Sequence, residues 1–363
     1  MKKILIDARE SGTSTGRYID KLIEYLYRLN PAHEIIILTK PDRVAFFQEI
    51  TPNFRVFSSP FKEFSFAEQF DFKKQLKDLR PDLVHFGKTE QPILYWGKTI
   101  TTIHDLTTAR FNNPAKNKVV FKIKQIIYKA VIIVASKKSK FILTPSNFVK
   151  KDLASFSKIN PSKIVVTYEA ADKITDKTIA LPALANKKFL LYVGRPNPHK
   201  NLGRLIKTFI ILRKTYPDLL LVLAGKKDVN YQKIESSLNP NIKPYIIFTD
   251  FISDGQLRYL YENCLAYVFP SLSEGFGLPG LEAMIHGAPV ISSSATCLPE
   301  IYSSAASYFN PLSVDDMVRT ISLVISDKNI RNKLITAGYS QIKKYSWQRM
   351  ANQTLDVYNK ALL

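Results

Sequence analysis

Two carboxylates, Glu274 and Glu282, lie eight positions apart in the sequence SEGFGLPGLEAM at residues 273–284. The glycines between them permit a positive φ or a close approach of the backbone to a ligand. A short apolar run precedes this stretch, and Pro279 occurs where the first turn of a helix accepts proline. The pattern predicts a strand, a tight loop and a helix whose N-terminus would face an anion. Because carboxylates face hydroxyls, cations or water instead, the ligand would combine a central phosphate with polyol groups.

Arg195 and Lys200 form a second candidate pair. They lie five positions apart on a loop that follows the apolar run at residues 189–194, and two prolines stiffen this loop. Arginine offers a planar fork of donors and lysine a compact charge, so both can converge on one diphosphate. Fixed cations would stabilise the charge that builds on a departing phosphate. Since these cations could replace a metal ion and the chain has no Asp-x-Asp pair, we expect no metal and no cofactor.

The stretch from Glu274 to Glu282 resembles the E-x7-E signature of the retaining glycosyltransferases of family 4. Further stretches fit that family in the same order along most of the chain: IHDL at 103–106, TPSNF at 144–148, YVGRPNPHKN at 192–201, GAPVI at 287–291 and LPE at 298–300. The resemblance implies an α/β chain with the GT-B fold, in which two Rossmann-like, doubly wound parallel-sheet domains face a central cleft.

The resemblance also implies roles for these residues in binding a nucleotide sugar. Glu282 would accept hydrogen bonds from the ribose hydroxyls, and Glu274 would accept them from the donor sugar. Arg195 and Lys200 would hold the diphosphate, with Glu274 counted beside them among the catalytic residues. Three further residues would contact the sugar or the diphosphate through backbone N–H groups: Phe276, Gly277 and Leu278.

Other expected site residues lie elsewhere in the sequence. Gly16, in the loop after the first strand, would approach the diphosphate, although family members usually carry two adjacent glycines where this chain has Gly12 and Thr13. Thr249, after another strand, would lie near the base. His104, at the end of TITTIH, is a fourth catalytic candidate. It would either hydrogen-bond a sugar hydroxyl or help to remove the acceptor proton.

Strands and helices alternate along the chain, which favours parallel sheets. Strands are expected at 3–7, 34–39, 82–86, 99–104, 141–146, 163–168, 189–194, 219–225, 245–250, 264–270 and 289–294. At 363 residues the chain exceeds what one core usually serves. We expect an acceptor-binding domain at 1–172, a linker at 173–188 and a nucleotide-sugar-binding domain at 189–345. The resemblance implies that residues 346–363 form a helix that packs back on the first domain.

The net charge of +21 is concentrated in one stretch, since positions 110–151 hold eleven basic residues and no acidic one. A helix is predicted at 119–134, with polar and apolar side chains on opposite faces. Its polar face would carry Lys118, Lys122, Gln125 and Lys129, and its core-facing side Val120, Ile123, Ile127, Val131 and Val134. The basic face would meet an anionic membrane or simply water. No nucleic-acid-binding motif accompanies the charge, so we expect no nucleic acid partner.

The resemblance implies a retaining hexosyltransferase, which we expect to be metal-independent. The spacing of IHDL, TPSNF and SSATCLPE is most similar to that of bacterial mannosyltransferases, so mannose from GDP-mannose is the first expectation for the donor. The acceptor would be lipid-linked or a polysaccharide. The N-terminus carries charges at Asp7 and Arg9, which argues against a signal peptide and for a cytoplasmic protein, peripheral on the inner membrane face. Alternatives are a UDP-hexose-dependent transferase, an epimerase or glucan synthase of the same fold, a Rossmann-type oxidoreductase, and a non-catalytic basic binding protein.

Overall fold

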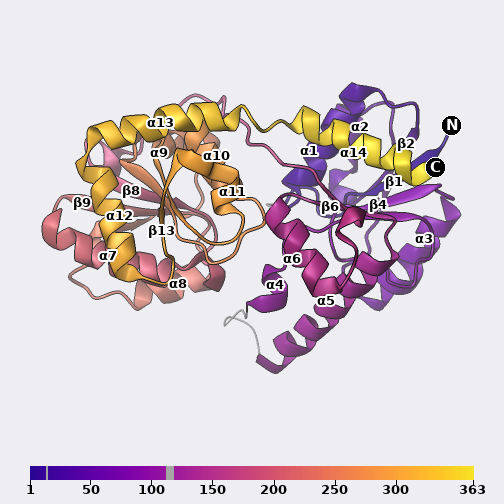
Figure 1. Ribbon diagram of the computed structural model, residues 1–363, viewed down its shortest axis with the longest axis horizontal. Coiled ribbons are helices and arrows are strands. Elements are labelled where there is room, and N and C mark those ends of the chain that lie inside the picture. The colour runs from indigo at the N-terminus through magenta and orange to yellow at the C-terminus, as the bar shows by residue number, and fades with distance from the viewer. Residues whose placement is uncertain (14, 112–117) are drawn as a thin grey trace. The chain divides into compact units, whose positions relative to one another are not determined.

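The computed structural model describes residues 1–13, 15–111 and 118–363, with side chains omitted at 118–120. Lys118 and Val120, assigned above to opposite faces of a helix, therefore have side chains outside the described residues. The chain forms two compact units, which are described here separately (Figure 1). Unit 1 comprises Met1–Arg110, Lys122–Glu169 and Ser346–Leu363, and unit 2 comprises Phe111–Phe121 and Ala170–Tyr345.

Unit 1 is built on a seven-stranded sheet with the order β3-β2-β1-β4-β5-β6-β7, and all its strand pairs are parallel. Strand order reverses between β1 and β4, as in Rossmann-like sheets. The strands are β1 (Lys3–Asp7), β2 (Glu34–Thr39), β3 (Arg55–Ser58), β4 (Leu83–Phe86), β5 (Thr99–Thr102), β6 (Phe141–Thr144) and β7 (Ile164–Val166). The α-helices are α1 (Arg17–Leu29), α2 (Val44–Ile50), α3 (Lys73–Asp78), α4 (Thr107–Arg110), α5 (Lys118–Lys138, which belongs to this unit from Lys122 on), α6 (Asn147–Ser157) and α14 (Trp347–Leu362).

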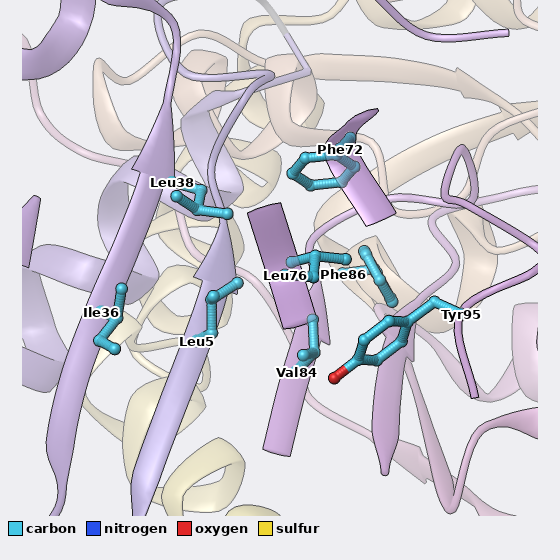
Figure 2. Close-up of a cluster of buried hydrophobic side chains, with 8 residues drawn as sticks. All are labelled: Leu5, Ile36, Leu38, Phe72, Leu76, Val84, Phe86 and Tyr95. Atoms are coloured by element: carbon cyan, nitrogen blue, oxygen red, sulfur yellow. The ribbon is translucent and has the colours of Figure 1, made fainter. Parts of the chain in front are cut away.

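Alternate strand residues build the core on one face of this sheet. Leu5, Val84 and Phe86 point to the same side of the sheet. They pack against Phe72, directly before α3, and against Leu76, which lies on α3 (Figure 2). All five side chains are fully buried. Buried apolar area of this kind is the main favourable contribution to folding, and it fixes the ends of β1 and β4 side by side.

The last helix of the chain belongs to unit 1 and packs on α1 (Figure 1). The Ser346 side chain caps α14 by accepting a hydrogen bond from the Arg349 backbone. Trp347 and Tyr358 are buried, and the Tyr358 hydroxyl lies 2.6 Å from Nδ1 of His85 on β4. Residues 346–363 thus complete the core of the unit that begins at the N-terminus.

Unit 2 repeats the same topology with six parallel strands in the order β10-β9-β8-β11-β12-β13. The strands are β8 (Lys188–Val193), β9 (Leu219–Ala224), β10 (Ile246–Phe248), β11 (Ala266–Phe269), β12 (Val290–Ser293) and β13 (Ala306–Phe309). The α-helices are α7 (Leu202–Thr215), α8 (Val229–Ser236), α9 (Asp254–Asn263), α10 (Leu278–Ile285), α11 (Leu298–Tyr302), α12 (Val314–Ser326) and α13 (Lys328–Ile342). Here the strand order reverses between β8 and β11.

The segment 173–188, expected to link the domains, packs along unit 2. The backbone N–H of Ile179 donates to the Gly255 carbonyl at 3.1 Å, and the Arg258 guanidinium donates to the Asp176 carbonyl at 3.0 Å. Gly255 and Arg258 both lie on α9. This stretch therefore lies against unit 2 and is held there by hydrogen bonds to its backbone. Because backbone groups make these contacts, its sequence needs no apolar periodicity.

Helix α5 orients its apolar residues differently from the sequence expectation. Ile123, Ile127 and Val134 were expected to face the core, but all three are exposed. Tyr128 and Ile132 are buried instead, in a cluster with β6 and α6. The reason is that this helix carries apolar side chains on two faces, so periodicity alone did not show which one meets the sheet. Of the described helices, none is long and apolar enough to span a bilayer.

The sequence reading also missed β3 and β13, two of the four edge strands of the two sheets. Arg55 and Ser58 at the ends of β3 are exposed, and β13 has the sequence ASYF. An edge strand is covered on fewer sides, so it needs no long apolar run.

Candidate active site

The point where strand order reverses in unit 2 brings two functional loops together. Strand β8 pairs with β9 on one side and β11 on the other. Arg195 and Lys200 lie on the loop after β8, and Glu274 lies on the loop after β11. In open α/β sheets, ligands bind beyond the carboxyl ends of the strands at such a reversal. These three residues, 74 to 79 positions apart across the two loops, thus lie at the same end of the sheet.

Lys200 and Glu274 form a direct ion pair. The Lys200 ammonium donates to Oε1 of Glu274 at 2.6 Å, and their side chains are only 18% and 12% exposed. The ammonium also lies 5.5 Å from the centroid of the Phe269 ring, at the end of β11. The backbone N–H of Glu274 donates to Oγ1 of Thr296 at 3.2 Å. A cation and a carboxylate are therefore held in fixed positions before any ligand binds.

Asn201 fastens the two loops to each other. It adopts a left-handed conformation with φ of 61°, and its side-chain amide donates to the carbonyls of Pro270 and Pro311 at 3.1 and 2.8 Å. The backbone N–H of Leu272 donates to the His199 carbonyl at 2.7 Å. Asn201 is buried, so these bonds form away from water, where an unmade one is costly. The position of Lys200 is thus set by its neighbour.

Arg195 is the exposed cation of the site. Its carbonyl accepts a hydrogen bond from the Tyr192 hydroxyl at 3.1 Å, which fixes the backbone. Within the described part of the chain, its guanidinium has no ion pair or hydrogen bond with another side chain. Its donors can therefore turn to an anionic ligand without breaking an internal contact.

Helix α10 begins at Leu278, directly after the loop that carries Glu274. Gly277 adopts φ of 97°, and its carbonyl accepts a hydrogen bond from the buried Tyr302 hydroxyl at 2.5 Å. The Phe276 side chain is buried against Tyr345, with ring centroids 5.4 Å apart. Burial of the Phe276 ring thus leaves the backbone of Phe276 and Gly277 as the part that could meet a ligand.

Glu282 and Thr249 lie on other elements of unit 2. Glu282 is on α10, beyond its first turn, and accepts from the Tyr261 hydroxyl at 3.3 Å. Thr249 follows β10, two strands away from β8, and its hydroxyl donates to the Asp250 carbonyl at 3.1 Å. This spread suits a ligand that extends from β11 across the sheet ends.

His104 lies in unit 1, just beyond β5. Its Nδ1 is 3.1 Å from Oε1 of Glu169, and its Nε2 is 3.2 Å from the Gly87 carbonyl. Both partners only accept hydrogen bonds when Glu169 is ionised, so both ring nitrogens carry protons. Burial opposes the charge, but the hydrogen bond and charge of Glu169, with smaller help from Gly87 and Asp105, raise the pKa of His104. The geometry therefore favours a role for His104 as an imidazolium that donates hydrogen bonds, and disfavours a role as a base.

A cavity of about 190 Å³ lies where strand order reverses in unit 1. It is lined by polar side chains that include Glu10, Lys88, Glu90 and His104, together with Tyr128 of α5. The Lys88 ammonium donates to the carboxylates of both Glu10 and Glu63. This small polar cavity lies at the kind of strand-order reversal where ligands bind in open α/β sheets.

Gly16 has an internal reason to be glycine. An added Cβ would lie 1.9 Å from the Glu10 carbonyl oxygen of the same loop. Only glycine allows α1 to start this close to the preceding turn. Gly16 therefore shapes the loop whether or not its backbone also meets a ligand.

Comparison with known proteins assigns the chain to a family. Residues 15–173 match the family described as Glycosyltransferase Family 4, and residues 175–341 match Glycosyl transferases group 1. The chain belongs to glycosyltransferase family 4. It is 32% identical to the O-antigen chain mannosyltransferase B of Escherichia coli over 238 residues, which cover 61% of this chain but only 60% of that enzyme.

Solved structures support the GT-B fold of this family 4 glycosyltransferase. Sucrose-phosphate synthase from Thermosynechococcus elongatus superposes with a TM-score of 0.76 at 18% identity, covering 99% of both chains. The Anabaena protein HepE, solved in complex with UDP-glucose, gives a TM-score of 0.73 at 14% identity, covering 99% of this chain and 100% of that one. The likeness extends over both units.

Sequence reasoning missed residues that position the side chains and loops of this site and to which the motifs had assigned no role. Glu169 follows β7, so the strand-end rule that singled out His104 could also have found it. Asn201 stands directly after Lys200 in the quoted stretch, but its contacts with Pro270 and Pro311 depend on the tertiary fold. Tyr302 had no signal in the sequence. Over the described residues, no cluster of three or more histidine, cysteine or acidic side chains could hold a metal ion.

The packing of α10 generates a stability prediction. A Cβ at Gly280 would lie 2.3 Å from both Cζ and the hydroxyl of buried Tyr302. Gly280→Ala should therefore lower the free energy of unfolding by about 1–3 kcal/mol, as overpacking does, measured by urea denaturation. The matched control is Gly203→Ala on α7, where nothing lies within 4 Å. It should be neutral or slightly stabilising. Equal effects at both glycines would contradict the packing argument.

The His104–Glu169 pair generates a pH prediction. Because folding raises the pKa of His104, the pair stabilises the protein fully below the ordinary histidine value of about 6.5 and loses this effect as pH rises through the folded pKa. Glu169→Gln should lower the pKa of His104 in an NMR titration and destabilise most at low pH. His85 is the control, because burial lowers its pKa to about 3 and keeps it neutral. An unchanged His104 titration would refute the pairing.

Proposed function

We propose that this chain is a retaining hexosyltransferase that moves mannose from GDP-mannose to a lipid-linked or polysaccharide acceptor. The observation that carries the proposal is the Lys200–Glu274 ion pair beside the exposed Arg195, at the strand-order reversal of unit 2. Two cations suit a diphosphate, and a carboxylate between them and α10 suits the hydroxyls of a sugar. The similarity to an O-antigen mannosyltransferase supports mannose as the sugar.

The cations would act on charge that develops as the donor breaks. The bond between the anomeric carbon and the diphosphate oxygen breaks, and the acceptor oxygen bonds to the same carbon on the same face. The acceptor proton passes to the departing phosphate oxygen. Lys200 and Arg195 would stabilise the negative charge on that phosphate, where preorganised charges lower a barrier most. Glu274 is engaged by Lys200, which disfavours it as a covalent nucleophile. Trapping of a covalent glycosyl-enzyme would contradict this route.

We propose that the reaction needs no metal ion, because the two side-chain cations can neutralise the leaving diphosphate. A divalent ion bound to the same phosphates would have to share them with Lys200 and Arg195. Activity should then persist in the presence of a chelator. Glu282 would contribute binding of the nucleoside, since its carboxylate accepts hydrogen bonds and lies on the next part of α10.

A UDP-hexose is the alternative donor. The structural neighbour HepE was solved with UDP-glucose, and Thr249 and its neighbours at the end of β10 are where this family member would contact the base. A non-catalytic binding protein is less consistent with the site, because Arg195, Lys200, Glu274 and Glu282 are all present in one unit.

For the location, we propose the cytoplasmic side of the cell membrane, with the basic unit 1 on the anionic lipid surface. The charge supports this, because residues 110–151 contain no acidic side chain that would repel such a surface. Each lysine near an anionic leaflet contributes about 1 kcal/mol.

Removal of the Lys200 charge tests the diphosphate assignment. Lys200→Ala should lower kcat about 100-fold or more, with a smaller change in KM, because the charge acts mainly on the transition state. Steady-state kinetics with the donor measures both constants. Glu282→Ala should instead raise KM. Lys333→Ala, at an exposed position on α13, is the control and should change neither constant. Full turnover by Lys200→Ala would refute the assignment.

Thermal stabilisation tests the donor class. The purified protein should show a clear rise in Tm with GDP and GDP-mannose, of equal size with magnesium or a chelator. A rise with UDP and UDP-glucose alone would identify the alternative donor. A rise that needs magnesium would contradict metal independence. The absence of any rise would favour the non-catalytic binding protein.

A further inference from the structure

Helix α5 presents an apolar stripe to solvent. Ile123, Ile126 and Ile127 are 54%, 61% and 48% exposed, and Val134 is exposed two turns further along. Their spacing of three, four and seven positions places them on one face of a helix. The opposite face, with Tyr128 and Ile132, is already buried in unit 1. The stripe is therefore a second apolar face that the fold of unit 1 leaves uncovered.

An exposed aromatic side chain lies close to the C-terminal end of α5. Trp96 is 81% exposed, and the Lys138 ammonium at the end of α5 lies 5.6 Å from its ring centroid. We call Trp96 and the stripe on α5 the apolar face of unit 1. Apolar side chains gathered in the open along one helix mark a site of interaction.

The side chains around this face are basic. Lys122, Lys124 and Lys137 on α5 are exposed, and Lys98 follows Trp96 closely. The described residues of α5 include no acidic side chain. Isoleucine and aromatic side chains between lysines match the composition of helices that lie in the plane of a membrane interface, where tryptophan also concentrates.

We propose that the apolar face of unit 1 inserts into the interface of an anionic membrane, with α5 lying parallel to the surface. This deepens the proposed membrane location and is independent of the donor assignment. Charge decides against a second copy of the chain as the occupant, because a symmetric pairing of this face would place α5 lysines against α5 lysines. Insertion of this face would add a hydrophobic contribution to the electrostatic attraction that the sequence predicts.

Vesicle binding separates the two contributions. Co-sedimentation would use phosphatidylcholine vesicles with and without phosphatidylglycerol, at low and high salt. The intact chain should bind the anionic vesicles and retain part of this binding at high salt. The double variant Ile126→Asp and Ile127→Asp should lose at least about tenfold in partitioning, including the salt-resistant part, since each buried isoleucine contributes roughly that factor. Lys122→Glu with Lys124→Glu should lose mainly the salt-sensitive part.

The control variants lie in unit 2. Leu323→Asp on α12 changes a side chain of similar exposure, 50%, and Lys333→Glu on α13 removes an exposed charge. Neither should alter vesicle binding. Donor hydrolysis in solution should be equal in all four variants, so a failed donor site and a failed membrane site give different results. Vesicle binding by the isoleucine double variant equal to that of the intact chain would overturn the proposal.

Trp96 reports insertion directly. The chain has two tryptophans, and Trp347 is buried in α14 at 3% exposure, so a change in emission on adding vesicles would come from Trp96. Its emission should shift to the blue and be quenched by brominated lipid, and Trp96→Phe should abolish both signals. Vesicle binding with an unshifted Trp96 would overturn insertion. Self-association through this face, seen as concentration-dependent sedimentation without lipid, would overturn the choice of partner.

Discussion

Strand β8 hydrogen-bonds to β9 on one side and to β11 on the other, and the meeting of the two candidate-site loops of unit 2 follows from this arrangement. Parallel strands end at the same edge of a sheet, and the reversal of order leaves their following loops with no helix between them. The loop with Lys200 and the loop with Glu274 therefore meet, although 74 positions separate these residues. Neither loop could hold a charge in place alone, because an isolated loop lacks fixed partners.

The contact between the two loops is rigid in a way that matters for catalysis. The buried Asn201 amide joins them through its bond to the Pro270 carbonyl and is held further by the Pro311 carbonyl after β13, and Tyr302 fixes the turn that opens α10. Cations that are already in place need no reorganisation when charge appears on a leaving group. The ion pair adds a second consequence. A diphosphate bound as proposed would share Lys200 with Glu274, and the carboxylate would then be free to accept hydrogen bonds from sugar hydroxyls.

The sequence was informative where the physics is local and less so where contacts are distant. The strand, loop and helix around residues 273–284 could be predicted because glycine, proline and an apolar run act within a few positions, and the fold class followed. The edge strands β3 and β13 were missed because they are only partly covered. The Lys200–Glu274 contact and the partnership of His104 with Glu169 depend on strand order, which no single sequence displays. The predicted orientation of α5 was wrong for another reason. Both faces of this helix carry apolar side chains, so periodicity cannot show which face is buried.

That two-faced helix connects the chemistry of unit 1 to its surroundings. Tyr128 on the buried side of α5 lines the cavity at the reversal of β1 and β4, while Ile126 and Ile127 on the same turn face outward. A helix with its side chains is about 10–12 Å across, so the cavity lies roughly one helix diameter behind the apolar face. With α5 in the lipid interface, a sugar in the cavity would be within reach of an acceptor whose lipid tail stays in the bilayer. A polysaccharide without a lipid anchor would gain nothing from this placement, so the exposed stripe favours the lipid-linked acceptor of the two.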